Sequence, residues 1–483
     1  MNFILIVSDT LRRDHLGCYG NSWIHTEHLD RFASKSLVFD RAYSASFPTV
    51  PNRRDIMTGR LTAAYTDWAP LTSQETVLAE VLGRHGYTTM MVCDCPHILE
   101  NGYGFDRGFD GFEWIRGQES DRWRTSPETP AHACDPGKIR NPDWIQRRHR
   151  RNVADRRYER DTFVARTATA ACEWLQDNYR QPFFLYVDTF DPHEPWDAPQ
   201  WYVDRYDPGY TGQVVDYPRY DYCDYLTPDE LRHCRALYAA EVTLVDRWIG
   251  RVLQQIEDLG LLDNTVVMLT TDHGFLLGEH GFIGKSLITA GAAEQPRRPG
   301  ERTGGGLMMS YIPLYEEIVH IPLIVHRPGV NAGRTDALVQ PPDLMPTILD
   351  LAGIPIPESV DGIPFGPVLR RESDDHRTFA VSAPYLANPT AAVTVVKDPW
   401  TAVLTPKRPV GEGGRDKAVD GVTKGTARRA VSADLLFDMA ADPQQAADVS
   451  AEHPAVLKDL RSALVAELTR VGASEEVVRL WRE

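Results

Sequence analysis

The sequence predicts an α/β protein with a large, mostly parallel sheet flanked by helices, followed by a smaller α+β domain. Five short runs rich in β-branched and other apolar residues indicate strands. They cover residues 3–7, 87–92, 183–187, 265–271 and 321–325. The first run, Phe3–Val7, is apolar throughout, as is typical of a parallel strand that is buried on both faces. Helical patterns separate several of these runs, so we expect helices on both faces of the sheet.

The helical patterns lie at residues 76–82, 161–178 and 344–352, and the clearest one spans residues 244–256. There, apolar residues recur at i, i+4 and i+8 with adjacent partners, which makes a wide apolar stripe on one face of a helix. Gly260 marks the end of this pattern. We therefore expect this helix to pack on the core of the large domain.

The length of 483 residues exceeds the usual size of one hydrophobic core, so two domains are expected. We place a catalytic α/β domain at residues 1–375 and a C-terminal α+β domain at residues 376–483. The second domain has short strand patterns and a closing helix, at residues 391–396, 400–404, 435–437 and 454–470.

Two long segments have no readable periodicity. Residues 118–160 are polar and rich in Pro, Arg and Asp, and we expect them to run over the surface. Residues 286–312 include Gly304–Gly306, and a loop of this length inside a compact domain is typical of a lid or a partner contact.

The chain has 52 basic and 68 acidic residues and a formal net charge of −16, which argues against nucleic acid or an anionic membrane as its main partner. An anionic substrate remains open, because a metal and a few arginines can dominate a local field. The seven cysteines are odd in number and show no repeated pair spacing, so no disulfide framework is expected. Neither a leader pattern nor a long apolar run is found, and we expect a cytoplasmic protein.

Polar side chains follow four of the predicted strands. They are Asp9, Asp94 with His97, His193, and Asp272 with His273. Because the carboxyl ends of parallel strands meet at one edge of a sheet, we expect these side chains to lie close together. Carboxylate and imidazole ligands suit one divalent ion. A plainer interpretation also exists, in which an aspartate at a strand end caps a helix, and His97 and His280 are hydrogen-bonded loop residues.

Residues 49–60 predict a short helix that begins near Thr49, has Pro51 in its first turn and stops at Gly59. At a helix N-terminus, unpaired backbone N–H groups and the helix dipole favour a developing alkoxide. Arg53, one turn later, could lean back over Thr49. A threonine hydroxyl needs a base or a metal to act as a nucleophile, and the alternative is that Thr49 only caps the helix.

Several stretches spread over most of the chain match one family. They are residues 4–20, 49–60, Asp191–His193, Thr271–Gly274, Gly278–Gly281 with Lys285, 315–324, 343–353 and 436–443. In these stretches the chain resembles the sulfatase branch of the alkaline phosphatase superfamily. The resemblance implies an alkaline-phosphatase-like fold and an enzyme that hydrolyses ester bonds.

The resemblance also implies a metal site. Asp9, Asp272 and His273 would hold one divalent metal ion, which would be Ca, Mn or Zn, and Thr10 and Thr49 would complete the ligand set. A second metal ion, by analogy with two-metal members of the superfamily, remains an alternative for which the candidate ligands are Asp94, His97, Asp188 and Asp191.

The remaining roles concern the ester substrate. The resemblance implies that Arg53 and Lys285 bind the anionic ester and that His193 protonates the leaving oxygen. Asp94 and His97 stand at positions that bind substrate in the family.

Three positions depart from the sulfatase pattern. Thr49 stands where sulfatases carry a cysteine or serine that is oxidised to formylglycine, and a threonine cannot be converted to that aldehyde. Thr10 replaces the second acidic residue of the usual Asp-Asp pair, which leaves the metal site with less negative charge. Asp94 replaces a lysine three residues before the histidine, which removes one contact to the anion.

These departures favour phosphorus over sulfur. A sulfated formylglycine releases sulfate by collapsing to the aldehyde, whereas a threonine ester must be cleaved by water, and a phospho-threonine allows in-line attack beside a metal. We therefore expect a metal-dependent hydrolase of phosphate diesters or phosphonate monoesters that works through a covalent phospho-threonine. The alternatives are a sulfatase that works without formylglycine and an inactive binding protein that keeps the fold. The expected partner is a small anionic ester, and the 286–312 loop or the C-terminal region is the expected contact in a homo-oligomer.

Overall fold

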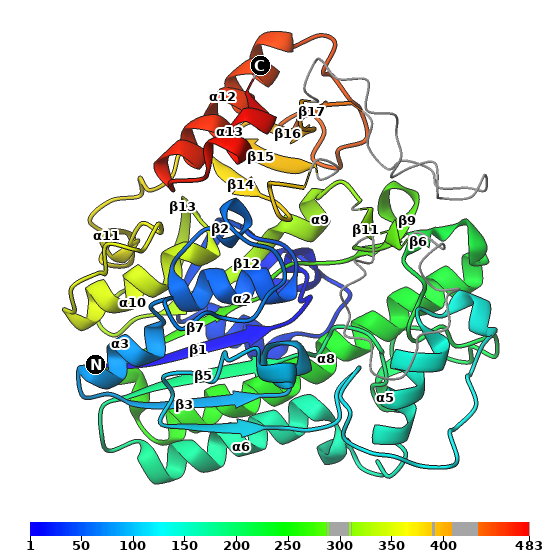
Figure 1. The fold of residues 1–483 in the computed structure, drawn as a ribbon. Coiled ribbons are helices and arrows are strands. Elements are labelled where there is room, and N and C mark those ends of the chain that lie inside the picture. The colour runs from blue at the N-terminus through cyan, green and yellow to red at the C-terminus, as the bar shows by residue number, and fades with distance from the viewer. Residues whose placement is uncertain (286, 289–308, 311, 389–391, 408–432, 483) are drawn as a thin grey trace.

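The computed structural model describes residues 1–285, 287–288, 309–310, 312–388, 392–407 and 433–482. Its centre is an eight-stranded sheet in the order β13-β2-β12-β7-β1-β5-β3-β4 (Figure 1). All of these strands run in one direction except β12, which is antiparallel to its neighbours β2 and β7. The strands are β1 (Asn2–Ser8), β2 (Leu37–Tyr43), β3 (Thr88–Cys93), β4 (Gly111–Trp114), β5 (Phe183–Thr189), β7 (Thr265–Thr270), β12 (His320–His326) and β13 (Gly333–Val339). The predicted large, mostly parallel sheet is confirmed.

Strand β1 is buried on both faces, as its apolar sequence predicts. Phe3, Leu5 and Val7 belong to the core on one face of the sheet, and Ile4 and Ile6 belong to the core on the other. This division follows from the alternation of side chains along a strand.

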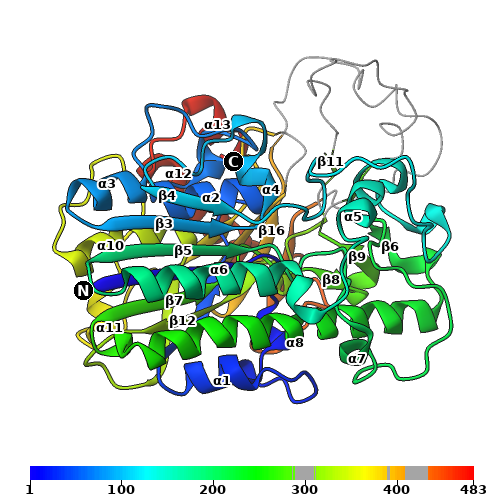
Figure 2. The same cartoon turned by 90° about the horizontal axis from the view of Figure 1, so that it is seen from below.

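Helices cover each of these two cores. The helices on the side of Ile4 and Ile6 are α1 (Glu27–Ala33), α6 (Phe163–Asn178) and α8 (Pro228–Asp258), which lie along one face of the sheet in Figure 2. The helices on the other side are α2 (Thr49–Thr58), α3 (Leu78–Arg84), α10 (Leu344–Ala352) and α11 (Gly366–Leu369). The helical stripe at residues 244–256 is the C-terminal half of α8, and its apolar residues are buried against the sheet.

Shorter elements surround the sheet. The short helices are α4 (Pro96–Leu99), α5 (Arg147–Asn152), α7 (Gln200–Val203) and α9 (Glu316–Val319). A small sheet has the order β6-β9-β8, with strands Asp221–Tyr222, Phe282–Gly284 and Leu276–Leu277, and β10 (Leu287–Ile288) pairs with β11 (Met309–Ser310).

A second, antiparallel sheet lies in the C-terminal part of the chain, at the top of Figure 1. Its strands are β14 (Ala380–Ser382), β15 (Val393–Lys397), β16 (Trp400–Leu404) and β17 (Leu435–Asp438), and α12 (Pro454–Arg470) and α13 (Glu475–Trp481) pack on it. Backbone hydrogen bonds of 2.8 Å tie Ala383 to Ala45 and Phe47 in the large domain. The domain boundary between residues 375 and 376 stays a prediction.

The sequence missed three strands of the large sheet, β2, β4 and β13. Charged side chains interrupt their apolar pattern, as Asp40 and Arg41 do in β2, and β4 and β13 are edge strands with one unpaired side. The predicted surface course of residues 118–160 is wrong at its beginning, because residues 118–121 are buried and contact the protein interior.

The predicted 286–312 lid or partner contact lies mostly outside the described residues. Among the residues that the structure describes, no helix combines the length and the apolarity needed to span a bilayer.

Candidate active site

The carboxyl ends of the parallel strands bring the predicted site residues to one edge of the large sheet. Asp9 follows β1, and Asp272 and His273 follow β7, which is the next strand in the sheet. Thr49 reaches the same edge from β2, because residues 44–48 lead directly from the end of that strand into α2. The juxtaposition agrees with the rule that ligand sites of α/β sheets lie beyond the carboxyl ends of strands.

Three of these side chains form a candidate metal site. One carboxylate oxygen each from Asp9 and Asp272 and a ring nitrogen of His273 lie within 4.8 Å of one another, and all three residues are buried. Asp9 Oδ2 is buried and makes no aligned hydrogen bond among the described residues, and its contact is an ion pair with Arg53 Nη1 at 2.9 Å. A divalent cation would give this oxygen a further partner.

The orientation of His273 also fits a metal ligand. Its Nδ1 lies 3.0 Å from the carbonyl oxygen of Gly274, so Nδ1 carries the proton and Nε2 presents a lone pair. Burial lowers the pKa of His273 to about 3, and the Lys285 charge acts in the same direction, so the imidazole is neutral. A neutral imidazole is the form that binds metals.

Arg53 is completely buried in the middle of three carboxylates. Its Nε and Nη2 donate to the two oxygens of Asp188 at 3.0 and 2.8 Å, and its Nη1 lies 2.9 Å from Asp9 Oδ2 and also donates to Asp272. The guanidinium holds the carboxylates of the candidate metal site in place. The expectation that Arg53 leans over Thr49, and its contact with the ester, stay predictions.

The charges in this cluster do not balance. Asp9, Asp188 and Asp272 face the two cations Arg53 and Lys285. Burial raises the pKa of Asp9 well above its usual range, and the neighbouring Asp272 charge adds to this. Burial opposes ionisation of Asp272 as well, but Arg53, His273 and Lys285 hold its pKa below the usual range. With all three carboxylates ionised, the cluster would have one negative charge more than its two cations offset, and a divalent ion would favour that ionised form.

Thr10, predicted as a further ligand, braces the two aspartates. Its Oγ1 donates to Asp9 Oδ1 at 2.7 Å, and its backbone N–H donates to Asp272 Oδ1 at 3.0 Å. Thr10 has a φ of 63°, which is rare for a β-branched residue and costs about 1–3 kcal/mol. Tyr238 helps to hold this conformation by donating to the Thr10 carbonyl at 2.7 Å. Strain of this kind is common where a site must be held in a fixed geometry.

Thr49 is the first residue of α2, and Pro48 is the residue before the helix. The side chain of Thr49 makes no hydrogen bond within the described residues, so it does not cap the helix. The start of α2 lies against the candidate metal site. Asn52 donates to the Asp272 carbonyl at 3.1 Å, and the ring of Phe47 lies 4.9 Å from the ring of His273, between centroids.

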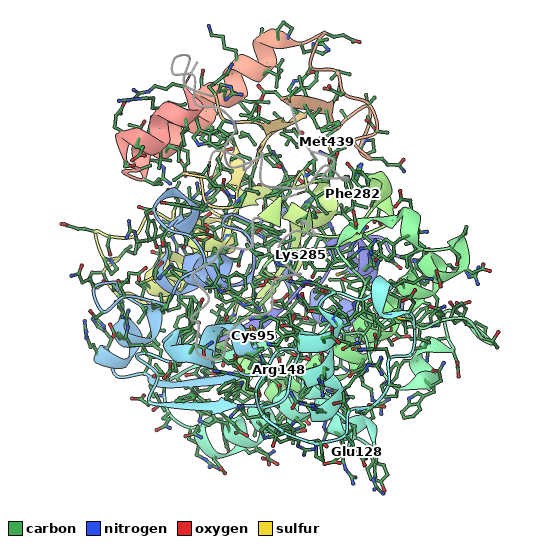
Figure 3. All side chains as sticks on the ribbon, turned by 45° about the vertical axis from the view of Figure 1, so that its right-hand side comes forward. Cys95, Glu128, Arg148, Phe282, Lys285 and Met439 are labelled. Atoms are coloured by element: carbon green, nitrogen blue, oxygen red, sulfur yellow. The ribbon has the colours of Figure 1, made fainter. Side chains whose placement is uncertain are left out.

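Lys285 comes from the end of β9 and is almost completely buried (near the centre of Figure 3). Its Nζ lies 3.1 Å from Nε2 of His273, where the ammonium donates to the imidazole lone pair, so an ion bound by Nε2 would replace this hydrogen bond. The Lys285 charge also acts on His193 and Glu194. Lys285 is thus a buried cation shared by the metal cluster and the histidine that was predicted as general acid, although its role in binding the ester stays a prediction.

His193 is buried and fixed through one ring nitrogen. Its Nδ1 donates to the carbonyl oxygen of Glu194 at 2.6 Å and lies 3.2 Å from the carboxylate of the same residue. Nε2 is therefore the atom that can exchange a proton. Burial and the Lys285 charge lower the pKa of His193 well below its usual value, so the imidazole is neutral in the free protein.

The site contains an acidic residue that sequence reasoning missed. Glu119 is buried, its Oε2 lies 3.0 Å from His97 Nε2, and its Oε1 accepts from Tyr217 at 2.7 Å. Residues 115–121 follow β4 at the same sheet edge, so the strand-end rule would have indicated Glu119 if β4 had been identified. Glu194, which directly follows His193 in the loop after β5, and Arg140, whose Nη1 lies 3.4 Å from Glu194, were also not predicted as site residues.

The other predicted substrate-binding residue, Asp94, has a full set of hydrogen bonds. It accepts from the hydroxyls of Thr167 and Thr189, at 2.7 and 3.0 Å, and from the backbone of Phe190. Burial raises the pKa of Asp94 to about 8, with Asp191 as the next cause. These contacts are those of a structural carboxylate, and a contact with substrate stays a prediction.

Within the described part of the chain, no second group of His, Cys, Asp and Glu side chains is arranged to hold a metal ion. Of its candidate ligands, Asp188 is paired with Arg53 and Tyr186, His97 with Glu119, and Asp191 with Gln118 and Val164. The ion pairs and hydrogen bonds of these side chains account for their burial without a second ion.

Comparison with known proteins assigns this chain to a family. A family model described as Sulfatase matches residues 1–354. An arylsulfatase of Clostridium perfringens is 25% identical over 425 residues, which is 78% of this chain and 80% of the relative. An N-acetylglucosamine-6-O-sulfatase of Bacteroides thetaiotaomicron is 24% identical over 449 residues, which is 80% of this chain and 73% of the relative.

A solved structure supports the fold. The phosphonate monoester hydrolase of Agrobacterium radiobacter superposes with a TM-score of 0.70 at 19% identity, and the match covers 97% of this chain and 96% of that one. The resemblance seen in the sequence motifs is thus confirmed, together with the alkaline-phosphatase-like fold. The chain belongs to the sulfatase family and is a hydrolase of ester bonds.

Proposed function

We propose that this protein hydrolyses phosphate diesters or phosphonate monoesters and that Thr49 is the nucleophile. The observation that carries the proposal is Thr49 itself. Its hydroxyl cannot be converted to formylglycine, has no hydrogen-bond partner among the described residues, and lies at a helix start that packs on a candidate metal site. The fold similarity to a phosphonate monoester hydrolase supports the same substrate class.

The reaction has two displacement steps. In the first, Thr49 Oγ gives up its proton to solvent and forms a bond to phosphorus while the bond from phosphorus to the leaving oxygen breaks, and that oxygen takes a proton from His193 Nε2. In the second, a water molecule gives a proton to His193 Nε2 while its oxygen bonds to phosphorus, the bond to Thr49 Oγ breaks, and the threonine oxygen takes up a proton from solvent.

His193 must gain a proton before it can act as the acid. Its Nδ1 proton is committed to the Glu194 carbonyl, so the transferable proton resides on Nε2. Lys285 disfavours the protonated form in the free protein. An anionic ester bound beside Lys285 would offset that charge, and general-acid catalysis would then depend on bound substrate.

Asp9, Asp272 and His273 would hold the divalent ion, with Thr10 and Thr49 at its edge, and Ca, Mn and Zn are the candidates. When bound, such an ion supplies a Lewis acid that lowers the pKa of a hydroxyl and neutralises ester charge. Arg53 keeps the aspartates in position, and Lys285, whose Nζ lies 3.1 Å from His273 Nε2, would provide a cation for the bound ester.

Hydrolysis of sulfuric esters is the second candidate. It is supported by the matching relatives, which are named arylsulfatase and N-acetylglucosamine-6-O-sulfatase. An unmodified threonine would have to pass sulfate to water, and a sulfo-threonine offers less charge for a metal to act on than a phospho-threonine does.

The test compares rates on p-nitrophenyl sulfate, a bis-aryl phosphodiester and a phenyl phosphonate, after the metal content of the purified protein is measured. We expect about one equivalent of metal and a preference for the phosphorus esters. Thr49→Ala should lower that rate by at least about 1000-fold, and Thr49→Ser, which keeps a hydroxyl, should retain part of it. A preference for the sulfate would support the second candidate, and a Thr49→Ala variant with the wild-type rate would exclude Thr49 as nucleophile.

A further inference from the structure

The segment that carries Glu119 is held rigidly. Asp121 binds Arg116 through both oxygens, at 2.8 and 2.7 Å, and accepts from the backbone of Gly117 at 2.7 Å. Asn152 of α5 donates to the carbonyl oxygens of Gly117 and Asp121 at 2.9 Å each. Gln118 donates to Asp191 at 2.6 Å, which fixes the segment to the loop after β5.

Glu119 points inward from this segment with an unusual backbone. Its φ is 41°, in the left-handed region that a non-glycine residue adopts at an energetic cost, and 2% of the residue is exposed. A strained and buried glutamate needs a compensating interaction. Strained residues of this kind cluster at functional sites.

The two oxygens of Glu119 have different contacts. Oε1 accepts a hydrogen bond from the Tyr217 hydroxyl at 2.7 Å. Oε2 is buried without an aligned hydrogen bond among the described residues, and its contact is the ion-pair distance of 3.0 Å to His97 Nε2. Its charge also acts on His193, and Arg140 is a further cation near it. Among the described residues, His97 is the imidazole that Glu119 contacts directly.

His97 and His193 both contact the ring of Phe190. Ring centroids are 5.5 Å apart for His97 and Phe190 and 4.0 Å apart for His193 and Phe190. Trp68 and His97 make an edge contact, with centroids 5.3 Å apart. His97 thus contacts two aromatic rings, and its side chain keeps 23% exposure. Packing fixes where the ring lies, but the Glu119 contact decides which nitrogen carries the proton.

We propose that Glu119 is a positioning residue of this active site, which holds His97 in the tautomer that has its proton on Nε2 and its lone pair on Nδ1. A carboxylate accepts and cannot donate when ionised, so the nitrogen that faces it must be the protonated one. The proposal deepens the proposed function, because it assigns an oriented imidazole to the ester site. Its kinetic test rests on the proposed function, whereas its NMR test does not.

The first test is imidazole nitrogen NMR of the metal-free and metal-loaded protein. In the wild type, His97 should show the Nε2-protonated tautomer. Glu119→Gln, whose amide can donate as well as accept, should give a mixture of the two His97 tautomers, because the acceptor-only carboxylate that faces Nε2 is lost. An unchanged His97 tautomer in Glu119→Gln would overturn the proposal. The other charged or titratable groups around Glu119 are Arg140, Tyr217 and His193, and His193 also faces Glu194 and Lys285.

Tyr217→Phe is the matched control. It removes the hydrogen bond to Oε1 and keeps the charge of Glu119, so the His97 tautomer should stay as in the wild type. If Glu119→Gln does not fold, Glu119→Asp gives the same readout, because it withdraws the carboxylate from Nε2 by one methylene. If the tautomer signal of His97 changes equally in Tyr217→Phe and in the Glu119 variants, the segment that carries Glu119 has only a packing role. That result would overturn the assignment of Glu119 as a positioning residue.

The second test is kinetic and uses the best of the three ester substrates. Glu119→Gln should lower kcat by about 10- to 100-fold with little change in KM, as loss of a partner that orients a histidine does elsewhere. In a His97→Gln background the same substitution should cause little further loss, because Glu119 acts through His97. If the losses of kcat in Glu119→Gln and His97→Gln were fully additive in the double variant, the proposal would be contradicted. Failure of all three esters would reject the proposed function, while the NMR result would still decide the role of Glu119.

Discussion

Two buried arginines each bind carboxylates in this protein, one at the edge of the large sheet and one between the two domains. Arg53 contacts Asp188, Asp9 and Asp272, and we call this set the Arg53 cluster. Arg377 binds both oxygens of Asp343, at 2.7 and 2.6 Å, and lies 3.4 Å from Glu467 of α12. We call the second set the Arg377 cluster.

The two clusters differ in how completely their carboxylates are satisfied. Asp343 accepts from the backbone of Gln340 and Ile363, at 3.0 and 2.8 Å, in addition to Arg377. Glu467 has Arg470 as a second partner at 2.7 Å. In the described part of the chain, neither oxygen of Asp343 lacks a donor.

In the Arg53 cluster, Asp9 Oδ2 makes no aligned hydrogen bond among the described residues. Three carboxylates there face Arg53 and Lys285, whereas the two carboxylates of the Arg377 cluster face two arginines. A buried ion cluster that is balanced and fully hydrogen-bonded joins parts of a fold. A cluster with more carboxylates than cations, in which one oxygen has an ion pair but no aligned hydrogen bond, is suited to bind a further cation.

The largest effect is expected when each arginine is replaced by methionine. Arg53→Met and Arg377→Met should each lower the free energy of unfolding by about 3–5 kcal/mol, because both leave buried carboxylates without a partner. Only Arg53→Met should also lower the rate of ester hydrolysis, by about 100- to 1000-fold. Urea unfolding and kcat of the folded variants measure the two effects. Equal losses of rate in both variants would remove the distinction between the clusters.

A smaller effect is expected from a divalent metal. A divalent ion at a concentration of about 100 times its dissociation constant should raise the free energy of unfolding by about 2.7 kcal/mol, because it binds the folded chain and not the unfolded one. Asp9→Asn should abolish this gain, and Asp343→Asn should leave it intact because Asp343 has no free oxygen. Thermal unfolding with chelator and then with Ca, Mn or Zn provides the measurement. Stabilisation that persists in Asp9→Asn would place the ion elsewhere.

The smallest effect concerns pH and the Arg377 cluster. Burial raises the pKa of Asp343, but Arg377 and His376 outweigh this and hold it well below the usual value of 3.8. Because the folded-state pKa is the lower one, the carboxylate stabilises the fold above the unfolded-state pKa and loses this contribution as pH falls. From about pH 5 to about pH 3 the loss should be about 1 kcal/mol.

Unfolding free energies of the wild type and of Asp343→Asn across that range test this prediction. The variant should be less stable at pH 5, and the difference should narrow towards pH 3. A constant difference would mean that Asp343 acts through packing and not through its charge.

The sequence by itself determined the frame of the site. The apolar run of β1 followed by Asp9, and that of β7 followed by Asp272 and His273, could be identified because buried parallel strands need continuous apolar residues. The start and end of α2 followed from Pro51 and Gly59, whose conformational limits act locally. Local patterns thus predicted which strand ends and which helix start carry the chemistry.

Only the tertiary structure decided how the charged side chains pair. Arg53 finds Asp188 and Asp272 more than 130 residues away in the chain, and this pairing depends on neutralising charge in the interior, which leaves no local pattern. Glu119 was not identified because it lies in a polar segment that looks exposed in the sequence. The burial of this segment depends on contacts with Asn152 and Asp191, which are distant in the chain. Local sequence encodes where the backbone turns, whereas burial and charge balance are properties of the assembled fold.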